Sequence, residues 1–383
     1  MPTARRWLAG SALLGGAVAA GAAALRLPVF GAAPEGERLD RMRRSPQWRD
    51  GTFHNPEAST VGASPTAIWE FVTANRSIRR PAEAVPTVAR TRADFEAPQD
   101  LRVTWLGHST ALLEIEGRRL LTDPVFSRNA SPGPLFGVSR FFEAPLPLGE
   151  VPRLDAVLLT HDHYDHLDFA AVRHLAGSVP RWIVPLGVGA HLERWGVAPE
   201  RITEADWWDE TEVDGLRVVC TPARHFSGRT LGDRNRTLWC GWALLGAERR
   251  LYVTGDGGYQ GAFAEVGRRL GAFDATLVET GAYNQSWADI HMGPEQAVRA
   301  VQDARGGLLI PVHWGTFDLA LHGWTEPIER VLVAAEAAGV PVVAPRPGES
   351  VVPEAAAPVE RWWPELPWQT AEEAPVMSSG VTA

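Results

Sequence analysis

The segment LLTHDHYDHLD, residues 158–168, places three histidines and three aspartates directly behind a run of apolar residues. Ionisable groups that gather at one buried place are costly unless something pairs them, and a divalent cation does so. In an extended segment His161 and His163 point to the same side, so both can bind one metal ion. Asp165 and His166 follow where the chain turns toward a helix, and they can bind a second ion nearby. Imidazole and carboxylate suit zinc, and also iron or manganese.

Three further segments repeat this form, in which a short apolar run ends in a polar side chain. The runs LRVVCTPAR, RRLYVTG and GGLLIPV are followed by His225, Asp256 and His313. Such β-branched runs are typical of strands that are buried on both faces. Helical patterns over residues 293–307 and 325–339 lie between or after them, with Pro and Gly at their ends. Strands that alternate with helices and carry polar groups at their ends predict an α/β layered fold.

The pattern divides the chain into four parts. Residues 1–26 hold two adjacent arginines before an Ala-rich apolar run, which indicates a signal peptide or a membrane anchor. Residues 27–95 form an irregular N-terminal extension with a short helix expected in SPTAIWEFVTA. Residues 96–350 carry the strand-end pattern, and residues 351–383 form a Pro-, Glu- and Trp-rich tail whose last residues are expected to be disordered. We therefore expect an exported (periplasmic or extracellular) or membrane-anchored protein, with a cytoplasmic location left open.

Charge and cysteine content narrow the class of protein. The formal net charge of −9 argues against a general nucleic-acid binder, which needs a basic face for phosphates. The two cysteines, Cys220 and Cys240, cannot form a disulfide framework. Each lies in an apolar stretch, so buried free thiols are expected.

The pattern H-x-H-x-D-H after an apolar strand resembles the metallo-β-lactamase superfamily of hydrolases, whose fold is an αβ/βα four-layer sandwich. Residues 96–350 are then the hydrolase domain. In that family the remaining metal ligands are a later histidine, a bridging aspartate and a final histidine, all at strand ends. The resemblance implies two ligand sets and one bridging residue: His161, His163 and His225; Asp165, His166 and His313; and the bridging Asp256.

Longer blocks, among them LLTDPVFSRNASPGP, TPARHFSGRTLGDRNRTLWCGWALLG, HMGPEQAV and VHWGTF, are similar to the family of N-acylphosphatidylethanolamine-hydrolysing phospholipase D and its bacterial relatives. The similarity runs from about residue 102 to residue 351. It implies that His291 lies by the metals as a catalytic neighbour and that Arg229 lies at the mouth of the site and binds substrate. The chain departs from that family at Glu279, where an apolar residue or proline is expected, and in its N-terminal part.

Four of these residues have a structural alternative. His108 and Asp123 also follow apolar runs, but the ligand set is already complete without them. We interpret them as groups that orient ligand imidazoles or close a turn, with a structural role equally open. His291 precedes a helix and could serve merely as its cap. Arg229 could form a surface ion pair.

The sequence thus predicts a binuclear metal-dependent hydrolase with two Zn²⁺ ions, and with iron or manganese as alternatives. We expect a phosphodiesterase of phospholipase D type that acts through a metal-bound hydroxide, oriented by Asp165, on N-acylphosphatidylethanolamine-like or other lipid phosphodiesters. The expected partners are a small-molecule or lipid substrate and a membrane surface, with no nucleic acid; no residue pattern indicates an oligomeric state. One alternative is a metallohydrolase of lactones or other esters. The other is a non-catalytic metal-binding protein, which ranks last because a structural zinc site is closed by four ligands.

Overall fold

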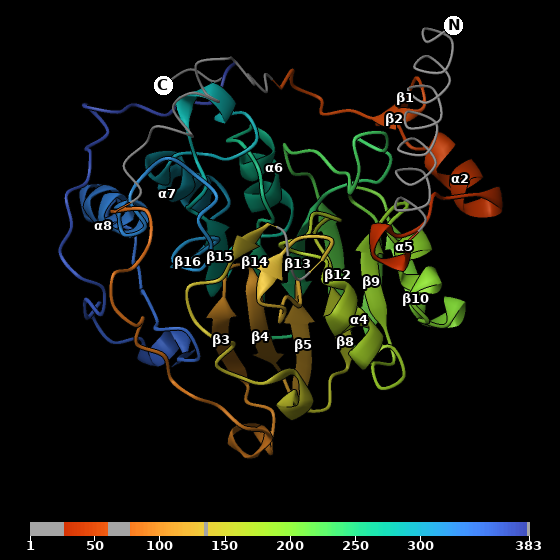
Figure 1. The fold of residues 1–383 in the computed structure, drawn as a ribbon, viewed down its shortest axis with the longest axis horizontal. Coiled ribbons are helices and arrows are strands. Elements are labelled where there is room, and N and C mark those ends of the chain that lie inside the picture. The colour runs from red at the N-terminus through yellow and green to blue at the C-terminus, as the bar shows by residue number, and fades with distance from the viewer. Residues whose placement is uncertain (1–26, 60–76, 134–136, 381–383) are drawn as a thin grey trace, which may run out of the picture.

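The computed structural model describes residues 27–59, 77–133 and 137–380 (Figure 1). The apolar segment 1–26 and the short helix expected within residues 64–74 lie outside these ranges. Among the described residues, no helix is both long and apolar enough to cross a bilayer.

The first of two large sheets has seven strands in the order β10-β9-β8-β5-β4-β3-β17. β17, β3, β4 and β5 pair antiparallel in succession, while β5, β8, β9 and β10 run parallel. Its strands are β3 (Leu101–Gly107), β4 (Thr110–Ile115), β5 (Arg118–Thr122), β8 (Ala156–Leu158), β9 (Trp182–Pro185), β10 (Ile202–Ala205) and β17 (Ser350–Val351).

The second sheet has six strands in the sequential order β11-β12-β13-β14-β15-β16. The first four pair antiparallel, and β14, β15 and β16 run parallel to one another. Its strands are β11 (Glu210–Val213), β12 (Leu216–Thr221), β13 (Gly241–Leu245), β14 (Arg250–Val253), β15 (Ala275–Glu279) and β16 (Leu308–Val312).

Two apolar layers hold the sheets and helices together. Successive strand residues point to opposite faces, so Leu112 packs outward with Val172 and Leu192 of the helices, while Leu113 packs inward with Trp242 of the second sheet. The predicted αβ/βα four-layer sandwich is therefore confirmed. Figure 1 shows one set of helices beside β8 and β9 and the other beside β15 and β16. These helices are α4 (Phe169–Leu175) and α5 (Gly189–Arg194), and α6 (Ala262–Arg269), α7 (Pro294–Asp303) and α8 (Glu326–Ala338).

Both terminal parts pack on the sandwich. The N-terminal extension, expected to be irregular, contains α2 (Gly36–Arg43) and buries Met42 and Phe53. The tail returns across the domain, where the Trp362 Nε1–H donates to the carbonyl of Ala344 at 2.9 Å. We expected disorder at the end of the tail, but the chain is ordered as far as Gly380. There the Ser378 hydroxyl donates to the carbonyl of the buried Ala288 at 2.7 Å.

Short elements complete the chain. The two cysteines are buried free thiols, as predicted. Two small hairpins pair β1 (Trp48–Arg49) with β2 (Thr52–Phe53), and β6 (Asn129–Ala130) with β7 (Val138–Ser139). The 3₁₀ turns are η1 (Pro28–Phe30), η2 (Arg92–Phe95), η3 (Leu148–Glu150), η4 (Pro199–Arg201), η5 (Gln285–Trp287) and η6 (Pro353–Ala355).

Candidate metal centre

Strand ends from both sheets bring all seven predicted ligands to one place. The loop after β8 carries four of them, and the other three follow β12, β14 and β16. Because parallel strands end at the same edge of a sheet, the residues after β14 and β16 necessarily lie on the same side of the sandwich. The donor atoms form overlapping groups in which every atom lies within 4.8 Å of the others.

The first group, here called the imidazole group, consists of His161, His163 and His225. Nε2 of His161 lies 2.8 Å from Nδ1 of His163, and Nε2 of His225 lies 3.3 Å from that same Nδ1. His225 donates its Nδ1–H to the carbonyl of Ile290 at 2.8 Å. This hydrogen bond fixes the tautomer that leaves the Nε2 lone pair free for a metal.

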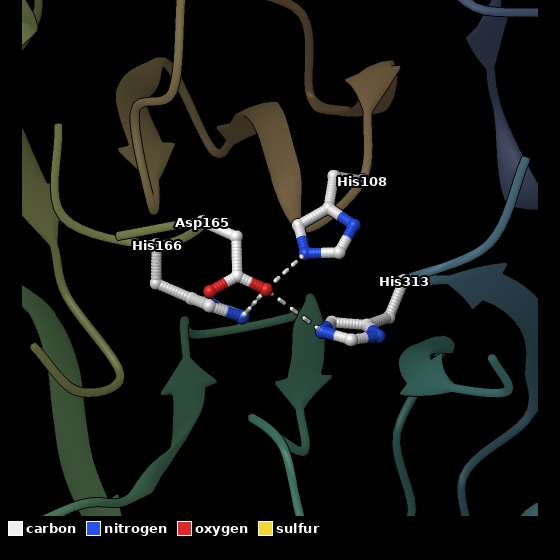
Figure 2. Close-up of side chains that lie close together, drawn as sticks. All are labelled: His108, Asp165, His166 and His313. Carbon is white, nitrogen blue, oxygen red and sulfur yellow. Dashed lines mark hydrogen bonds and ion pairs between the residues drawn. The ribbon is translucent and has the colours of Figure 1, made fainter. Parts of the chain in front are cut away.

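The second group, here called the carboxylate group, consists of Asp165, His166, Asp256 and His313. Oδ2 of Asp256 lies 3.1 Å from Nε2 of His166 and 2.8 Å from Nε2 of His313. Oδ2 of Asp165 lies 3.6 Å and 3.5 Å from the same two nitrogens (Figure 2). Asp256 and His166 also share a group with His161, so Asp256 stands between the two groups, as a bridging ligand must.

The donors of this centre fit divalent cations. Oδ1 of Asp256 is buried, and no described residue forms a hydrogen bond with it. Buried polar atoms without partners cost about 1–3 kcal/mol each. Imidazole nitrogens and carboxylate oxygens that converge in this way are the ligands of zinc and related metals.

Asp123 and His108 contact these ligands from behind. The carboxylate of Asp123 accepts from Nδ1 of His166 at 2.9 Å and from the backbone N–H of Thr160 at 2.8 Å. His108 Nε2 donates to Oδ2 of Asp165 at 2.9 Å. Both residues therefore make the contacts expected of groups that orient a ligand.

The backbone at two of the histidines is unusual. His108 and His313 have φ angles of 52° and 65°, a left-handed conformation that is uncommon for residues other than glycine. The N–H of His313 donates to the carbonyl of His108 at 3.0 Å. Such conformations persist only where the surrounding contacts impose them, and they gather at functional sites.

Burial and charge separate the two groups electrostatically. Burial lowers the pKa of His161 and of His225 well below its usual range, and it lowers the pKa of His163 to about 4. Burial also opposes protonation of His313, but the carboxylates, Asp256 foremost, outweigh it and raise the pKa of His313 to about 10. The imidazole group is thus neutral at pH 7, whereas the carboxylate group attracts positive charge.

The sequence did not assign a role to Glu279, the last residue of β15. It is completely buried, and its Oε1 contacts Nδ1 of His291 directly, while its Oε2 accepts from the N–H of Gly257 at 2.6 Å. Burial raises the pKa of Glu279, and Asp256 adds to that effect. The run ATLV before Glu279 has the same form as the runs before the ligands, so the strand-end signal was present.

His291 lies beside both groups. Its ring centroid is 5.0 Å from that of His225 and 5.3 Å from that of His313. Its backbone N–H donates to the carbonyl of Trp287 at 3.2 Å. Helix α7 begins at Pro294, and its N-cap residue is Gly293. The structure thus places His291 next to the predicted ligands, and its side chain does not cap α7.

Arg229 lies beside the loop that carries the predicted ligands, with its guanidinium held by backbone carbonyls. It is 4% exposed, and its guanidinium donates to the carbonyls of Asp162, Leu167 and Val29 at 2.7, 3.0 and 3.0 Å. Its cation also stacks on the ring of Tyr164 at 4.0 Å. These contacts occupy the guanidinium donors of Arg229 and hold the ligand loop, which follows β8 and carries four of the predicted ligands, against the N-terminal extension. They exclude the surface ion pair that was the alternative.

Comparison with known proteins agrees with this geometry. Residues 118–314 match the family model described as the beta-lactamase superfamily domain. An uncharacterized protein of Mycobacterium tuberculosis is 48% identical over 329 residues, which cover 84% of this chain and 88% of that protein. An N-acyl-phosphatidylethanolamine-hydrolyzing phospholipase D of Caenorhabditis elegans is 36% identical over 241 residues, 60% of this chain and 68% of its own.

Among solved structures, a metallo hydrolase of the archaeon Ignicoccus hospitalis has the same fold. Its TM-score is 0.52 at 23% identity, with 66% of this chain and 97% of that one covered. The family match spans both groups of donors, and the fold that carries them is shared. The chain therefore belongs to the metallo-β-lactamase superfamily, as a metal-dependent hydrolase.

Proposed function

We propose that this hydrolase is a binuclear phosphodiesterase of phospholipase D type that acts on lipid phosphodiesters. The observation that carries the proposal is the pair of donor groups joined by Asp256, because a structural zinc site would be closed by four ligands. The similarity to a phospholipase D acting on N-acyl-phosphatidylethanolamine supports the choice of substrate class.

The proposed reaction gives each residue of the centre a role. The imidazole group would hold one ion and the carboxylate group the other, with zinc as the metal that suits both sets. When bound, two such cations supply Lewis acidity for a phosphoryl oxygen and lower the pKa of water toward neutrality. Asp165 is held by His108, so its carboxylate has a fixed orientation at the centre. His291 offers an imidazole edge beside both groups, where it can hydrogen-bond a phosphoryl oxygen or the leaving group.

A pocket beside the ligand loop supports a substrate with apolar chains. Its volume is ≈ 460 Å³, and its lining includes the apolar side chains of Val29, Leu167 and Phe169, the ring of Tyr164 and the predicted substrate-binding residue Arg229. Tyr164 lies between two predicted ligands in the sequence, and its hydroxyl donates to the carbonyl of Arg229 at 2.7 Å. The loop that carries the ligands therefore also forms one wall of an apolar pocket, in which an acyl chain would be shielded from water.

The proposal is tested with zinc-loaded protein and three substrate classes: N-acylphosphatidylethanolamine in mixed micelles, a simple aryl phosphodiester, and a panel of acyl lactones. We expect hydrolysis of the lipid to a phosphomonoester, phosphatidic acid, and the N-acylated alcohol. Protein treated with chelator and the variant Asp256→Asn are the controls. Turnover of lactones alone, with both phosphodiesters untouched, would replace this proposal by the ester hydrolase.

We also infer that residues 1–26 direct export or anchoring, and that a membrane surface presents the substrate. The two adjacent arginines and the Ala-rich run that follows support this. Fractionation of the native host is expected to find the protein outside the cytoplasm or with the membrane. Recovery from the cytoplasm with the first residues intact would contradict it.

A further inference from the structure

We propose that Glu279 is a positioning residue, whose buried carboxylate fixes the imidazole of His291 beside the predicted ligand His313. The inference rests on the proposed function for the role of His291, but its evidence is the geometry around β15. Three observations carry it: the place of Glu279 in the sheet, the contacts of its two oxygens, and the exposure of the opposite edge of the His291 ring.

The position of Glu279 in the sheet explains why its carboxylate lies close to several predicted site residues. β15 lies between β14 and β16, and all three run parallel. The residues after β14 and β16 include Asp256 and His313, so the end of β15 lies between two predicted ligands. Asp256, Glu279, His291 and His313 accordingly form one group of donors within 4.8 Å.

Each oxygen of Glu279 has its own task. Oε2 accepts from the N–H of Gly257, which adjoins the bridging Asp256, at 2.6 Å. Oε1 contacts Nδ1 of His291 and lies 3.9 Å from Nδ1 of His313. Nδ1 of His313 is buried, and no described residue forms a hydrogen bond with it.

The contact between Glu279 and His291 has the partners of a hydrogen bond. Oε1 of Glu279 contacts Nδ1 of His291 directly, as a carboxylate that accepts from an imidazole N–H does. A carboxylate that accepts from Nδ1–H fixes the tautomer and leaves Nε2, on the opposite edge of the ring, to meet a reactant.

Exposure supports this direction. The side chain of Glu279 is 1% exposed, whereas that of His291 is 15% exposed. The imidazole thus has one edge in the protein interior, at Glu279, and another edge that solvent or substrate can reach. A residue that only filled space at this position would not need a charge, since an apolar side chain of similar size would avoid the cost of burying a carboxylate.

The test compares Glu279→Gln, which keeps an oxygen acceptor, with Glu279→Leu, which keeps only the volume. Protein labelled with ¹⁵N-histidine is studied by NMR with and without zinc, and the His291 signals are assigned from their loss in His291→Ala. We expect a proton on Nδ1 of His291 in the wild type, protected from exchange with solvent. It should persist in Glu279→Gln with a shifted frequency and disappear in Glu279→Leu. Asp123→Asn, which removes a carboxylate from His166 instead, should leave the His291 signals unchanged.

Metal content and turnover are measured on the same preparations. We expect Glu279→Gln to retain both ions and Glu279→Leu to lower kcat by about 10²-fold with a smaller change in KM, since it misplaces a catalytic neighbour. Thermal unfolding of each variant reports whether it folds. Identical His291 signals in the wild type and Glu279→Leu would overturn the positioning role. Loss of one ion in Glu279→Gln would make Glu279 a ligand instead. The NMR result is independent of substrate, so it stands even if the protein hydrolyses no phosphodiester.

Discussion

The two halves of the centre are built from different chemistry on the same edge of the fold. The imidazole group contains only histidines, whose pKa values burial lowers, with that of His163 at about 4. In the carboxylate group the pKa of His313 is raised to about 10, because neighbouring carboxylates outweigh burial. The first group is ready for a cation at neutral pH, whereas the second must exchange a proton for one. The difference teaches that two ions sharing one bridge need not bind with equal ease.

The largest effect should come from the residue that belongs to both halves. Asp256→Asn keeps the shape of the side chain but removes its negative charge, so both ions should bind worse and hydrolysis should fall by at least about 10³-fold. Elemental analysis and turnover on the same preparation check this. Asp165→Asn is the matched control, since Asp165 lies beside His166 and His313 of the carboxylate group and its loss should empty mainly that position. Equal behaviour of the two variants would show that Asp256 is no bridge.

A second prediction separates ligands from their neighbour. His291→Ala should retain both ions, because His291 is held by Glu279 and not by the donor groups, while kcat falls by about 10²–10⁴-fold as for a lost acid–base group. Metal content and steady-state kinetics are the measurements. If the variant loses metal as severely as Asp256→Asn does, the division into ligands and catalytic neighbour is wrong.

How far the sequence predicts this centre depends on the range of the contacts. The candidate ligands were found because each follows a short apolar run that is typical of a strand, and their division into two sets with a bridge was implied by the family resemblance. Glu279 carries the same signal but was set aside as a departure from the related family. The hydrogen bond from Arg229 to the carbonyl of Val29 was not predicted, because the two residues are 200 positions apart and no local pattern reveals such a contact. The docking of Ser378 against Ala288 is equally non-local.

The electrostatic difference between the halves predicts an unequal response to pH. Protons on His313 and His166 must leave before an ion binds there, because neighbouring carboxylates raise the pKa of His313 to about 10 and that of His166 well above its usual range. Affinity at the carboxylate group should therefore fall as pH decreases. His163 has a pKa of about 4, so the imidazole group should stay nearly constant until the pH approaches that value. Titration calorimetry with zinc at pH 8, 7 and 6 should show one affinity falling by up to about 10-fold per pH unit for each proton released, and the other changing little. Parallel changes at both positions would contradict this comparison.

The smallest effect on the centre should come from Arg229, which supports the ligand loop from outside. Arg229→Met removes hydrogen bonds to three carbonyls, two of them buried, and should lower the free energy of unfolding by about 3 kcal/mol, with both ions retained. Chemical denaturation measures this. Arg234→Met on the same loop is the control, because Arg234 only stacks on Phe226. A raised KM with unchanged stability would instead restore Arg229 as a substrate-binding residue.

Counting the ions tests the central claim most directly. Wild-type protein, His225→Ala and His313→Ala are loaded with zinc, freed of excess metal and analysed for zinc per chain. The claim of two positions joined by Asp256 predicts close to two ions in the wild type and close to one in each variant. The ion that remains in His313→Ala should be the one at the imidazole group, whose affinity changes little with pH. A wild-type protein that retains no zinc, or variants that both retain two ions, would contradict the claim.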